Sequence, residues 1–528
     1  MQKPLGTQIS HMLKERGVDV IFGIPGVHNQ ELYRGIEEAG ITHVLARHEQ
    51  GAGFMADGYA RATGNPGVAY VITGPGLCNI MTPMGQAYSD SVPLLVISSC
   101  LDETAAKKGQ LHQMKDQRAA AETVCDWSFE AKSAAAAYGL INRAFAEFQT
   151  KSPLPKHIQV PIAVLEAKTE AAPKAINHLK RIGVLPEDVI IAAEKLTHSK
   201  RPLFILGGGA AEAASEARAL LASLGAASYV TFAGSGIADL DDPLCYGAML
   251  SVTSSVDELK KADLVVCVGT DLAEVDHYRE VLGHQAPAIH VNLDPAVLSR
   301  AAAGDTTHLA DASAWFAAVN QTLKGHQTAT DWTEQEVAEA RARGLAEMDA
   351  IYPGIGLVCA ALRAAVPAET MIYSDMTQIA YMAKVVWDMD RPGHWHHPCG
   401  FGTLGYATPA AIGGAVARRG LPTMAIIGDY AFHYTMQELG VAVELGLSLP
   451  IILWDNGKLK EIEDSMIRSQ IAPNAVIARN PDFCKLAEAF GAKAEAPNTL
   501  EKLQEVVKRA FVSEGPTLIY VTPTITAQ

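Results

Sequence analysis

The chain has 528 residues, and at roughly 150 residues per domain this length predicts about three domains rather than one core. Apolar residues make up 48% and charged residues 19% of it, a composition that fills several cores and excludes a largely disordered chain. Acidic residues number 58 against 43 Lys and Arg, a net charge of −15. Such a surface repels phosphate backbones and anionic membranes, so neither nucleic acid nor a membrane is an expected partner.

The sequence also bears on the cellular compartment. It contains no run of about 18 apolar residues, the length that spans a membrane. The first ten residues show no apolar core after a basic stretch, as a secretory signal would require. The eight cysteines are scattered singly between Cys78 and Cys484, without a Cys-x-x-Cys pair. Together these features predict a cytoplasmic protein with reduced thiols.

Short apolar, β-rich runs alternate with longer segments of helical spacing. This rhythm predicts α/β architecture with parallel sheets throughout. Two stretches interrupt it: residues 166–183, rich in Ala, Lys and Glu, and residues 323–344, which form either a polar linker or an exposed charged helix. The chain is therefore expected to form three domains. The predicted strands are 20–23, 67–73, 93–98, 203–206, 264–269, 424–428 and 450–454.

Residues 47–61 follow a predicted strand that ends near Leu45. In this segment Glu49 enters a helix whose first turns consist largely of Gly and Ala, and such small residues permit close approach of another helix or of backbone. The helix is thus expected at a tight interface. Taken alone, Glu49 is most simply a helix-start carboxylate that the helix dipole favours.

A second feature joins two β-runs, one ending at Gly428-Asp429 and the next at Asp455-Asn456-Gly457. The segment between them is long enough for one crossover helix and its return strand. Asp429 and Asn456 offer hard oxygen ligands at the carboxyl ends of neighbouring strands, where one Mg²⁺ can bind and a helix N-terminus can receive a diphosphate. The alternative interpretation of Gly-Asp after a strand is an ordinary turn.

These motifs together resemble the thiamine-diphosphate enzymes of the acetolactate synthase and 2-oxo acid decarboxylase superfamily. The resemblance extends over essentially the whole chain, in motif order and in spacing. Within the superfamily it is greatest to the 5-guanidino-2-oxopentanoate (2-ketoarginine) decarboxylases. The motifs that carry it are the Glu49 segment, Gly74-Pro75-Gly76 with Asn79, residues 400–406 and Gly428-Asp429 with Asn456, and for the narrower group residues 23–28, 111–118 and 374–378.

The resemblance implies three doubly wound parallel-sheet domains. These are a pyrimidine-binding domain at 1–170, a central Rossmann-like domain at 184–325 and a diphosphate-binding domain at 345–528. It implies thiamine diphosphate and Mg²⁺ as cofactors and a small-molecule 2-oxo acid as substrate. In this family one cofactor contacts two subunits, so self-association as a dimer or a tetramer is expected, with active sites between subunits.

The resemblance also assigns roles to residues. Glu49 is expected to hydrogen-bond N1′ of the aminopyrimidine, so that N4′ can take a proton from C2 of the thiazolium. The Gly402 carbonyl is expected to hold the 4′-amino group, and Leu404 to keep the cofactor bent. His28 and His112 are candidates for proton exchange, because histidine titrates near neutral pH. The remaining expected cofactor residues are Gly428, Asp429, Tyr430 and Asn456, and the expected metal residues are Asp429, Asn456 and Lys458.

Three departures from the family pattern are visible. Tyr430 replaces the glycine of Gly-Asp-Gly, where it either crowds the diphosphate loop or is accommodated, and the retained ligands favour accommodation. Asp455 replaces the first Asn of Asn-Asn. Lys458 and Lys460 add positive charge beside the region that borders the substrate pocket in the family, which argues against a guanidinium substrate.

The leading functional hypothesis is non-oxidative decarboxylation of a 2-oxo acid to an aldehyde and CO₂. One alternative is a carboligase of acetolactate synthase type, which joins an enamine to a second carbonyl. Another is a non-catalytic scaffold, which the retained Glu49, Asp429 and Asn456 disfavour. Residues 394–399 have a metal-like composition without a distant ligand pair, and Gly207-Gly208-Gly209 resembles a nucleotide- or flavin-binding turn that many relatives keep empty.

Overall fold

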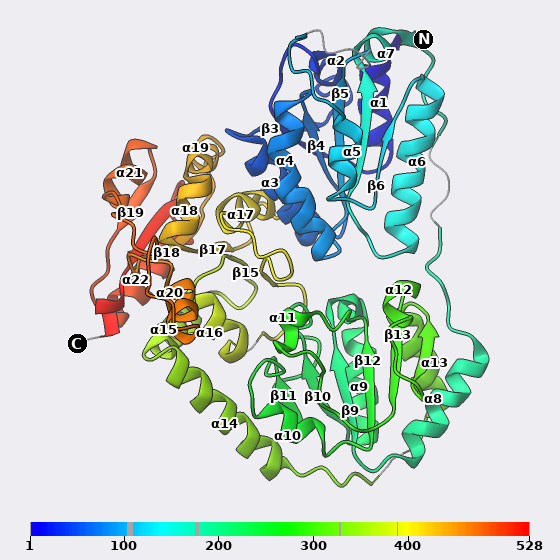
Figure 1. The fold of residues 1–528 in the computed structure, drawn as a ribbon, viewed down its shortest axis with the longest axis vertical. Helices are drawn as coiled ribbons and strands as arrows, with labels where there is room; N and C mark the ends of the chain where they lie inside the picture. The colour runs from blue at the N-terminus through cyan, green and yellow to red at the C-terminus, as the bar shows by residue number, and fades with distance from the viewer. Residues whose placement is uncertain (1, 103–108, 175–178, 327–328, 388, 527–528) are drawn as a thin grey trace. The chain divides into compact units, whose positions relative to one another are not determined.

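The computed structural model describes residues 2–102, 109–174, 179–326, 329–387 and 389–526. The chain forms two compact units (Figure 1). The first comprises the residues up to Leu179 together with Glu369–Thr377 and Phe401–Gln528, and the second comprises Lys180–Ala368 and Gln378–Gly400. The predicted stretches at 166–183 and 323–344 each include residues outside the described ranges, at 175–178 and 327–328.

The N-terminal part of the first unit is a six-stranded sheet with the order β3-β2-β4-β5-β7-β6, in which all strand pairs run parallel. The three strands predicted here are confirmed as β2, β4 and β5. The strands are β2 (Val20–Gly23), β3 (Thr42–Leu45), β4 (Gly67–Val71), β5 (Leu94–Cys100), β6 (Trp127–Glu130) and β7 (Lys156–Pro161); β1 (Lys3–Pro4) and β8 (Lys168–Thr169) form a separate antiparallel pair. The helices are α1 (Leu5–Glu15), α2 (Gln30–Arg34), α3 (Glu49–Thr63), α4 (Pro75–Ser89), α5 (Gln117–Glu122), α6 (Ala134–Thr150) and α7 (Ile162–Glu166).

Both faces of this sheet are buried. Alternate residues of a strand point to opposite sides of the sheet, and on β4 each set belongs to a different core cluster. On β4, Val68 and Tyr70 belong to a core cluster that includes Leu13 of α1 and Ile141 of α6. Their neighbours on the same strand, Ala69 and Val71, belong instead to the cluster that contains residues of α3 and α4. A strand buried on both faces reads as a continuous apolar run, as this one does in the sequence.

The C-terminal sheet has the order β16-β15-β17-β18-β20-β19. The pairs from β15 to β19 are parallel, and the strands predicted at 424–428 and 450–454 are confirmed. The strands are β15 (Met371–Ser374), β16 (Trp395–His396), β17 (Thr423–Gly428), β18 (Pro450–Trp454), β19 (Lys493–Glu495) and β20 (Thr517–Val521). The helices of the first unit in this part are α17 (Ala407–Ala417), α18 (Asp429–Thr435), α19 (Leu439–Glu444), α20 (Lys460–Arg468), α21 (Phe483–Ala489) and α22 (Leu500–Ala510), with short 3₁₀ turns η2 (Met436–Glu438) and η3 (Pro523–Thr526).

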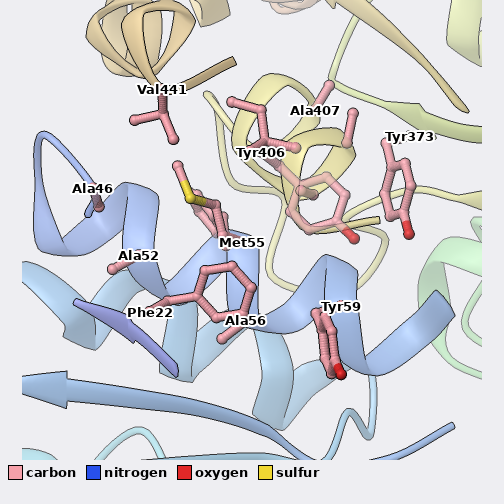
Figure 2. Close-up of a cluster of buried hydrophobic side chains, with 14 of the residues drawn as sticks. Phe22, Ala46, Ala52, Met55, Ala56, Tyr59, Tyr373, Tyr406, Ala407 and Val441 are labelled. Atoms are coloured by element: carbon pink, nitrogen blue, oxygen red, sulfur yellow. The ribbon is translucent and has the colours of Figure 1, made fainter. Parts of the chain in front are cut away.

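Helices α3 and α17 pack against each other within the first unit, as Figure 2 shows for the side chains around Met55, Tyr59 and Tyr406. A Cβ on Gly58 would lie 2.0 Å from the Ala410 carbonyl oxygen, and one on Gly413 would lie 1.9 Å from that of Met55. The tight interface predicted from the glycines and alanines of residues 47–61 is therefore confirmed, and α17 supplies the partner backbone.

The second unit contains the central sheet, whose order β11-β10-β9-β12-β13-β14 is parallel throughout. Gly207 and Gly209 follow β9 and pack against the backbone of Gly269, whose carbonyl accepts from the Gly209 N–H at 2.9 Å. The strands are β9 (Pro202–Leu206), β10 (Ala227–Val230), β11 (Cys245–Gly247), β12 (Leu264–Val268), β13 (Ala288–Asn292) and β14 (Thr306–Leu309). The helices are α8 (Pro186–His198), α9 (Ala214–Leu224), α10 (Ser255–Leu259), α11 (Glu274–His277), α12 (Pro295–Leu298), α13 (Ala312–Thr322), α14 (Glu334–Ile351), α15 (Ile355–Ala365) and α16 (Gln378–Val386), with the 3₁₀ turn η1 (Gly208–Ala213).

The described residues bear on two questions that the sequence raised: the conformation of the charged stretch after Leu323 and the presence of a membrane-spanning helix. The charge-dense stretch after Leu323 continues into the helix α14, which begins at Glu334 with a capping box from Thr333. No single helix among the described residues is long and apolar enough to cross a membrane; only α14 and α15, bent by 112° relative to each other, pass that test as a pair.

Candidate active site

The sheet topology of the first unit determines where the predicted site residues lie. In the N-terminal sheet the strand order reverses between β2 and β4, and in the C-terminal sheet it reverses between β15 and β17. Ligands of open parallel sheets bind outside the carboxyl ends of the strands at such reversals. The loops there carry His28 after β2, Gly74 after β4, Asp375 after β15 and Asp429 after β17.

Glu49 is the first residue of α3, and its side chain is buried. Helix α3 begins there because His48 caps it, its Nδ1 accepting the Gln50 N–H at 3.0 Å. One oxygen of Glu49, Oε2, accepts from Asn79 Nδ2 at 2.9 Å. A Cβ on Gly76 would lie 3.3 Å from the other oxygen, Oε1, so the missing side chain of this glycine leaves room beside Oε1. The two motifs that the sequence places apart thus meet at one carboxylate.

A second buried carboxylate, Glu438, lies beside the start of α3. Both of its oxygens accept from the Arg47 N–H, at 3.2 and 3.1 Å, and it fills the space where Gly51 has no side chain. Burial raises the pKa of Glu438 to about 7, although hydrogen bonds from the backbone N–H groups of Arg47 and His48 lower the pKa in part. No motif in the sequence points to Glu438.

His28 and His112 form a pair, with ring centroids 4.8 Å apart in an edge-to-face arrangement. The Nδ1 atom of each ring is buried and has no hydrogen-bond partner among the described residues. Burial and the neighbouring His112 lower the pKa of His28. His112 has a positive φ of 61°, and its carbonyl lies against Gly74 at the start of α4. The structure therefore joins two histidines that come from loops after different strands.

The loop before α17 contacts the far end of α4. Thr403 Oγ1 donates to Gln86 Oε1 at 3.0 Å, and Phe401 covers Gly85. Gly402 has a φ of 65°, a conformation suited to glycine, and Leu404 packs against the core cluster of α3 and α17. Asn79 and Gln86 are two turns, about 10 Å, apart along α4. Glu49 and this loop therefore meet different ends of one helix.

At the carboxyl end of the C-terminal sheet, Asp429 follows β17 and Asn456 follows β18, and these two strands are paired as Gly428 with Trp454. Asp429 is the first residue of α18 and is buried. Asn456 Oδ1 accepts the Lys458 N–H at 3.1 Å, which forms a tight turn. The predicted metal residues thus lie at the ends of adjacent strands.

Asp455 and Asp429 are linked by a residue that the sequence gives no reason to select. Asn480 Nδ2 donates to Asp429 Oδ2 at 2.7 Å and to Asp455 Oδ1 at 2.8 Å. Burial, with Asp455 nearby, raises the pKa of Asp429 to about 6. A pair of close carboxylates is a favourable place for a divalent cation, which relieves their repulsion.

Comparison with known proteins identifies the family. Family models described as the N-terminal, central and C-terminal domains of thiamine pyrophosphate enzymes match residues 4–120, 189–319 and 375–521. The chain is 40% identical to the probable 2-ketoarginine decarboxylase AruI of Pseudomonas aeruginosa, over 97% of this chain and 93% of that relative. It belongs to the thiamine pyrophosphate enzyme family. The family resemblance predicted from the motifs, and the fold class of three parallel-sheet domains, are confirmed.

More distant relatives of this thiamine pyrophosphate enzyme are acetolactate synthases. The isozyme 2 large subunit of Escherichia coli is 27% identical over 97% of this chain and 94% of that relative. The mitochondrial catalytic subunit of Saccharomyces cerevisiae is 27% identical over 98% of this chain and 80% of that relative. Thiamine diphosphate is accordingly the cofactor of the enzyme, and Mg²⁺ is the usual partner metal of the family.

The residues at the C-terminal sheet edge fit a magnesium diphosphate. Asp429 and Asn456 supply the carboxylate and amide oxygens that Mg²⁺ prefers. Beside Gly428, the Thr377 hydroxyl is buried and has no hydrogen-bond partner among the described residues, so a donor is free for a phosphate oxygen. Tyr430 lies within α18, where its backbone is helical, and no positive φ is needed there. The backbone at Tyr430 is therefore free of the left-handed strain that a glycine would relieve.

The metal-like composition of residues 394–399 has no counterpart in the structure. His394 Nδ1 lies 3.0 Å from the Pro392 carbonyl. Among the described residues, no group of three or more His, Cys, Asp or Glu side chains is arranged to hold a metal ion. Alternate residues on an extended segment face opposite ways, which explains why composition alone misleads there.

Proposed function

We propose that this thiamine pyrophosphate enzyme decarboxylates a 2-oxo acid to an aldehyde and CO₂, and that its substrate is 5-guanidino-2-oxopentanoate. The observation that carries the proposal is the 40% identity to the probable 2-ketoarginine decarboxylase, which extends over 97% of the chain rather than over one domain. The acetolactate synthases share the same architecture at 27% identity, so carboligation is the alternative outcome of the test below.

Bound thiamine diphosphate supplies the electron sink for cleavage of the bond to the carboxylate. We propose that Glu49 shares a proton with N1′ of the aminopyrimidine, because its buried carboxylate is held by one N–H from Asn79 and has a second oxygen beside Gly76. The Gly402 carbonyl is proposed to accept from the 4′-amino group, and Leu404 to support the bent cofactor from below.

The His28 and His112 pair is proposed to exchange protons with substrate and product. The lowered pKa of His28 favours its neutral form near neutral pH, and a neutral imidazole can both accept and donate a proton. This supports proton transfer rather than anchoring of an anionic substrate.

We propose that Asp429, Asn456 and Lys458 hold the Mg²⁺, Lys458 through its backbone, and that Gly428 and Tyr430 lie against the diphosphate. The strand pairing that brings Asp429 and Asn456 to one sheet edge supports this assignment. A magnesium ion held there would balance the charge of the diphosphate.

The two lysines that argued against a guanidinium substrate are neutralised within their own segment. Lys458 Nζ is 2.9 Å from Glu463 Oε2, and Lys460 pairs with Asp464. Each positive charge is therefore partly balanced by a neighbouring carboxylate, which lowers the net positive charge of the segment. The two lysines therefore weigh less against a guanidinium substrate than the sequence indicated.

We further propose self-association, with each active site shared by two copies of the chain. The support is that Glu49 and the Gly402 loop contact opposite ends of α4 in one chain. Domain limits of 1–170, 184–325 and 345–528 are part of this proposal, since the three family-model matches each fall within one of them. A cytoplasmic location is proposed from the eight free thiols.

The proposal is tested with a panel of 2-oxo acids, measuring CO₂, aldehyde and acyloin separately. We expect turnover of 5-guanidino-2-oxopentanoate to the aldehyde and CO₂ in equal amounts. The matched control is 5-ureido-2-oxopentanoate, which has the same length without the charge and should react more slowly. CO₂ released with acyloin in place of aldehyde would establish the carboligase, and no preference for the cationic substrate would refute the guanidinium assignment.

A further inference from the structure

Asn480 lies in the segment between α20 and α21, outside every motif described above. Its side-chain amide nevertheless reaches the proposed metal site: Nδ2 donates to Asp429 Oδ2 at 2.7 Å and to Asp455 Oδ1 at 2.8 Å. Its carbonyl oxygen lies 3.2 Å from His433 Nε2, a residue of α18. Both polar atoms of the amide are thus engaged, the nitrogen through two hydrogen bonds and the oxygen through one contact, which fixes its orientation as well as its position.

Asp455 is itself held firmly. Its Oδ1 also accepts the Gly457 N–H at 2.9 Å, and its Oδ2 accepts the Tyr520 hydroxyl at 2.9 Å from the neighbouring strand β20. An asparagine at 455 would offer one acceptor oxygen where Asp455 offers two. Asp455 therefore serves as an anchor for Asn480 and Tyr520, a role that the amide of the usual family pattern would fill less completely.

From this arrangement we propose that Asn480 is a positioning residue for Asp429, bonding one carboxylate oxygen so that the other is presented to the metal. The inference rests on the proposed role of Asp429 as a Mg²⁺ ligand. Outer partners of a metal ligand orient it and alter metal affinity, typically about 10- to 100-fold. Asp455, which shares Asn480 with Asp429, would add a second negative charge beside a cation bound there.

The test measures metal affinity rather than turnover. Mn²⁺ is titrated into each full-length variant with saturating thiamine diphosphate, and free Mn²⁺ is followed by its paramagnetic resonance signal. For Asn480→Ala we expect a Kd for Mn²⁺ that is larger by roughly 10-fold or more. The paramagnetic resonance spectrum of the bound ion should also change. Asn480→Gln keeps both N–H donors and should recover part of the affinity.

The matched control is Asn474→Ala, the same substitution in the same segment, because Asn474 is exposed and its amide bonds only to the Ala472 carbonyl in the described structure. It should bind Mn²⁺ like the wild type. A Kd for Asn480→Ala within about twofold of wild type, far below the usual effect of such partners, would overturn the proposal.

Two further variants complete the test. Asp429→Ala separates this inference from the proposed metal site. If Asp429→Ala binds Mn²⁺ normally, the proposed metal site itself is wrong. If Asp429→Ala loses Mn²⁺ binding while Asn480→Ala binds normally, only the role of Asn480 is rejected. If Asn480→Ala does not fold, Asp455→Asn decides, since it keeps the shape of the anchor. A weaker Kd for Mn²⁺ in Asp455→Asn is expected, and an unchanged one rejects the network.

Discussion

Glu49 illustrates how a single buried carboxylate can be available for chemistry. Asn79 occupies one of its oxygens at 2.9 Å, and the missing side chain of Gly76 leaves room at the other. A carboxylate placed in this way can take or give one proton without losing all of its hydrogen bonds. The same residue in a solvated helix terminus would only interact with the helix dipole.

We predict that Glu49→Gln binds thiamine diphosphate with little change but loses turnover by roughly 100-fold or more, the usual contribution of a positioned acid–base group. An amide cannot share a proton with N1′ as a carboxylic acid does. Steady-state turnover and calorimetric titration of the cofactor check the two halves of the prediction. Activity within about threefold of wild type, roughly 0.65 kcal/mol, would remove Glu49 from the mechanism.

Glu438 provides a prediction for stability as a function of pH. Its pKa in the folded chain is about 7, above the ordinary value of 4.5, so the folded state holds this proton more tightly than the unfolded state. Its contribution to stability is therefore complete below about pH 4.5 and is lost as the pH rises through about 7. The loss should amount to roughly 1–3 kcal/mol.

The melting temperature of the wild type should therefore fall between pH 5 and pH 8 by more than that of Glu438→Gln. Differential scanning calorimetry of both proteins at the two pH values measures this. The matched control is Glu444→Gln, because the Glu444 side chain is 59% exposed and pairs with Arg47 at the surface. If the melting temperature depends on pH in the same way in the wild type and in Glu438→Gln, Glu438 does not titrate in this range.

At the scale of elements, the contact of α3 with α17 determines the geometry around the site (Figure 2). Helices approach this closely only where side chains are absent, as at Gly58 and Gly413. Polar bonds complete the contact, since the Tyr373 hydroxyl donates to the Gly58 carbonyl at 2.7 Å and the Tyr406 hydroxyl to Asp57 at 2.8 Å. The spacing of the two helices is thus set by backbone contact.

We predict that Gly413→Ala lowers the melting temperature, because its Cβ would lie 1.9 Å from the Met55 carbonyl oxygen and force the helices apart. A cost of roughly 1–3 kcal/mol or more is expected from such overpacking. Gly139→Ala is the matched control: Gly139 lies in α6 with nothing within 4 Å of an added Cβ. There alanine should stabilise the helix by about 0.5–1 kcal/mol. Equal effects of the two substitutions would contradict the packing argument.

At the scale of the whole molecule, we propose that two chains share each active site. This proposal is tested by combining two different variants in one dimer. A purified heterodimer of one Glu49→Gln chain and one Asp429→Ala chain contains one site with both substitutions and one site with neither. We expect it to recover about half of the wild-type activity, although each parent homodimer is inactive, because a two-fold dimer has two equivalent sites. Sites formed within one chain would leave the heterodimer inactive.

Much of the fold follows from local sequence. Strands buried on both faces appear as apolar runs, so β4, β17 and β18 could be placed closely from the sequence, and their alternation with helices predicts parallel sheets. Asp429 and Asn456 could be paired in advance, because the carboxyl ends of neighbouring parallel strands lie at one edge. In these cases the relevant distance along the chain is short or is fixed by regular geometry.

The sequence by itself therefore determined the α/β architecture, the cofactor motifs and the glycine-rich contact face of α3. Only the tertiary structure decided that His28 meets His112, that Glu438 lies beside the start of α3, that Lys458 is neutralised by Glu463 and that Asn480 joins Asp429 to Asp455. These contacts join loops whose conformations obey no short periodicity. Their partners are chosen by burial and hydrogen bonding in the packed chain, which residue spacing does not encode.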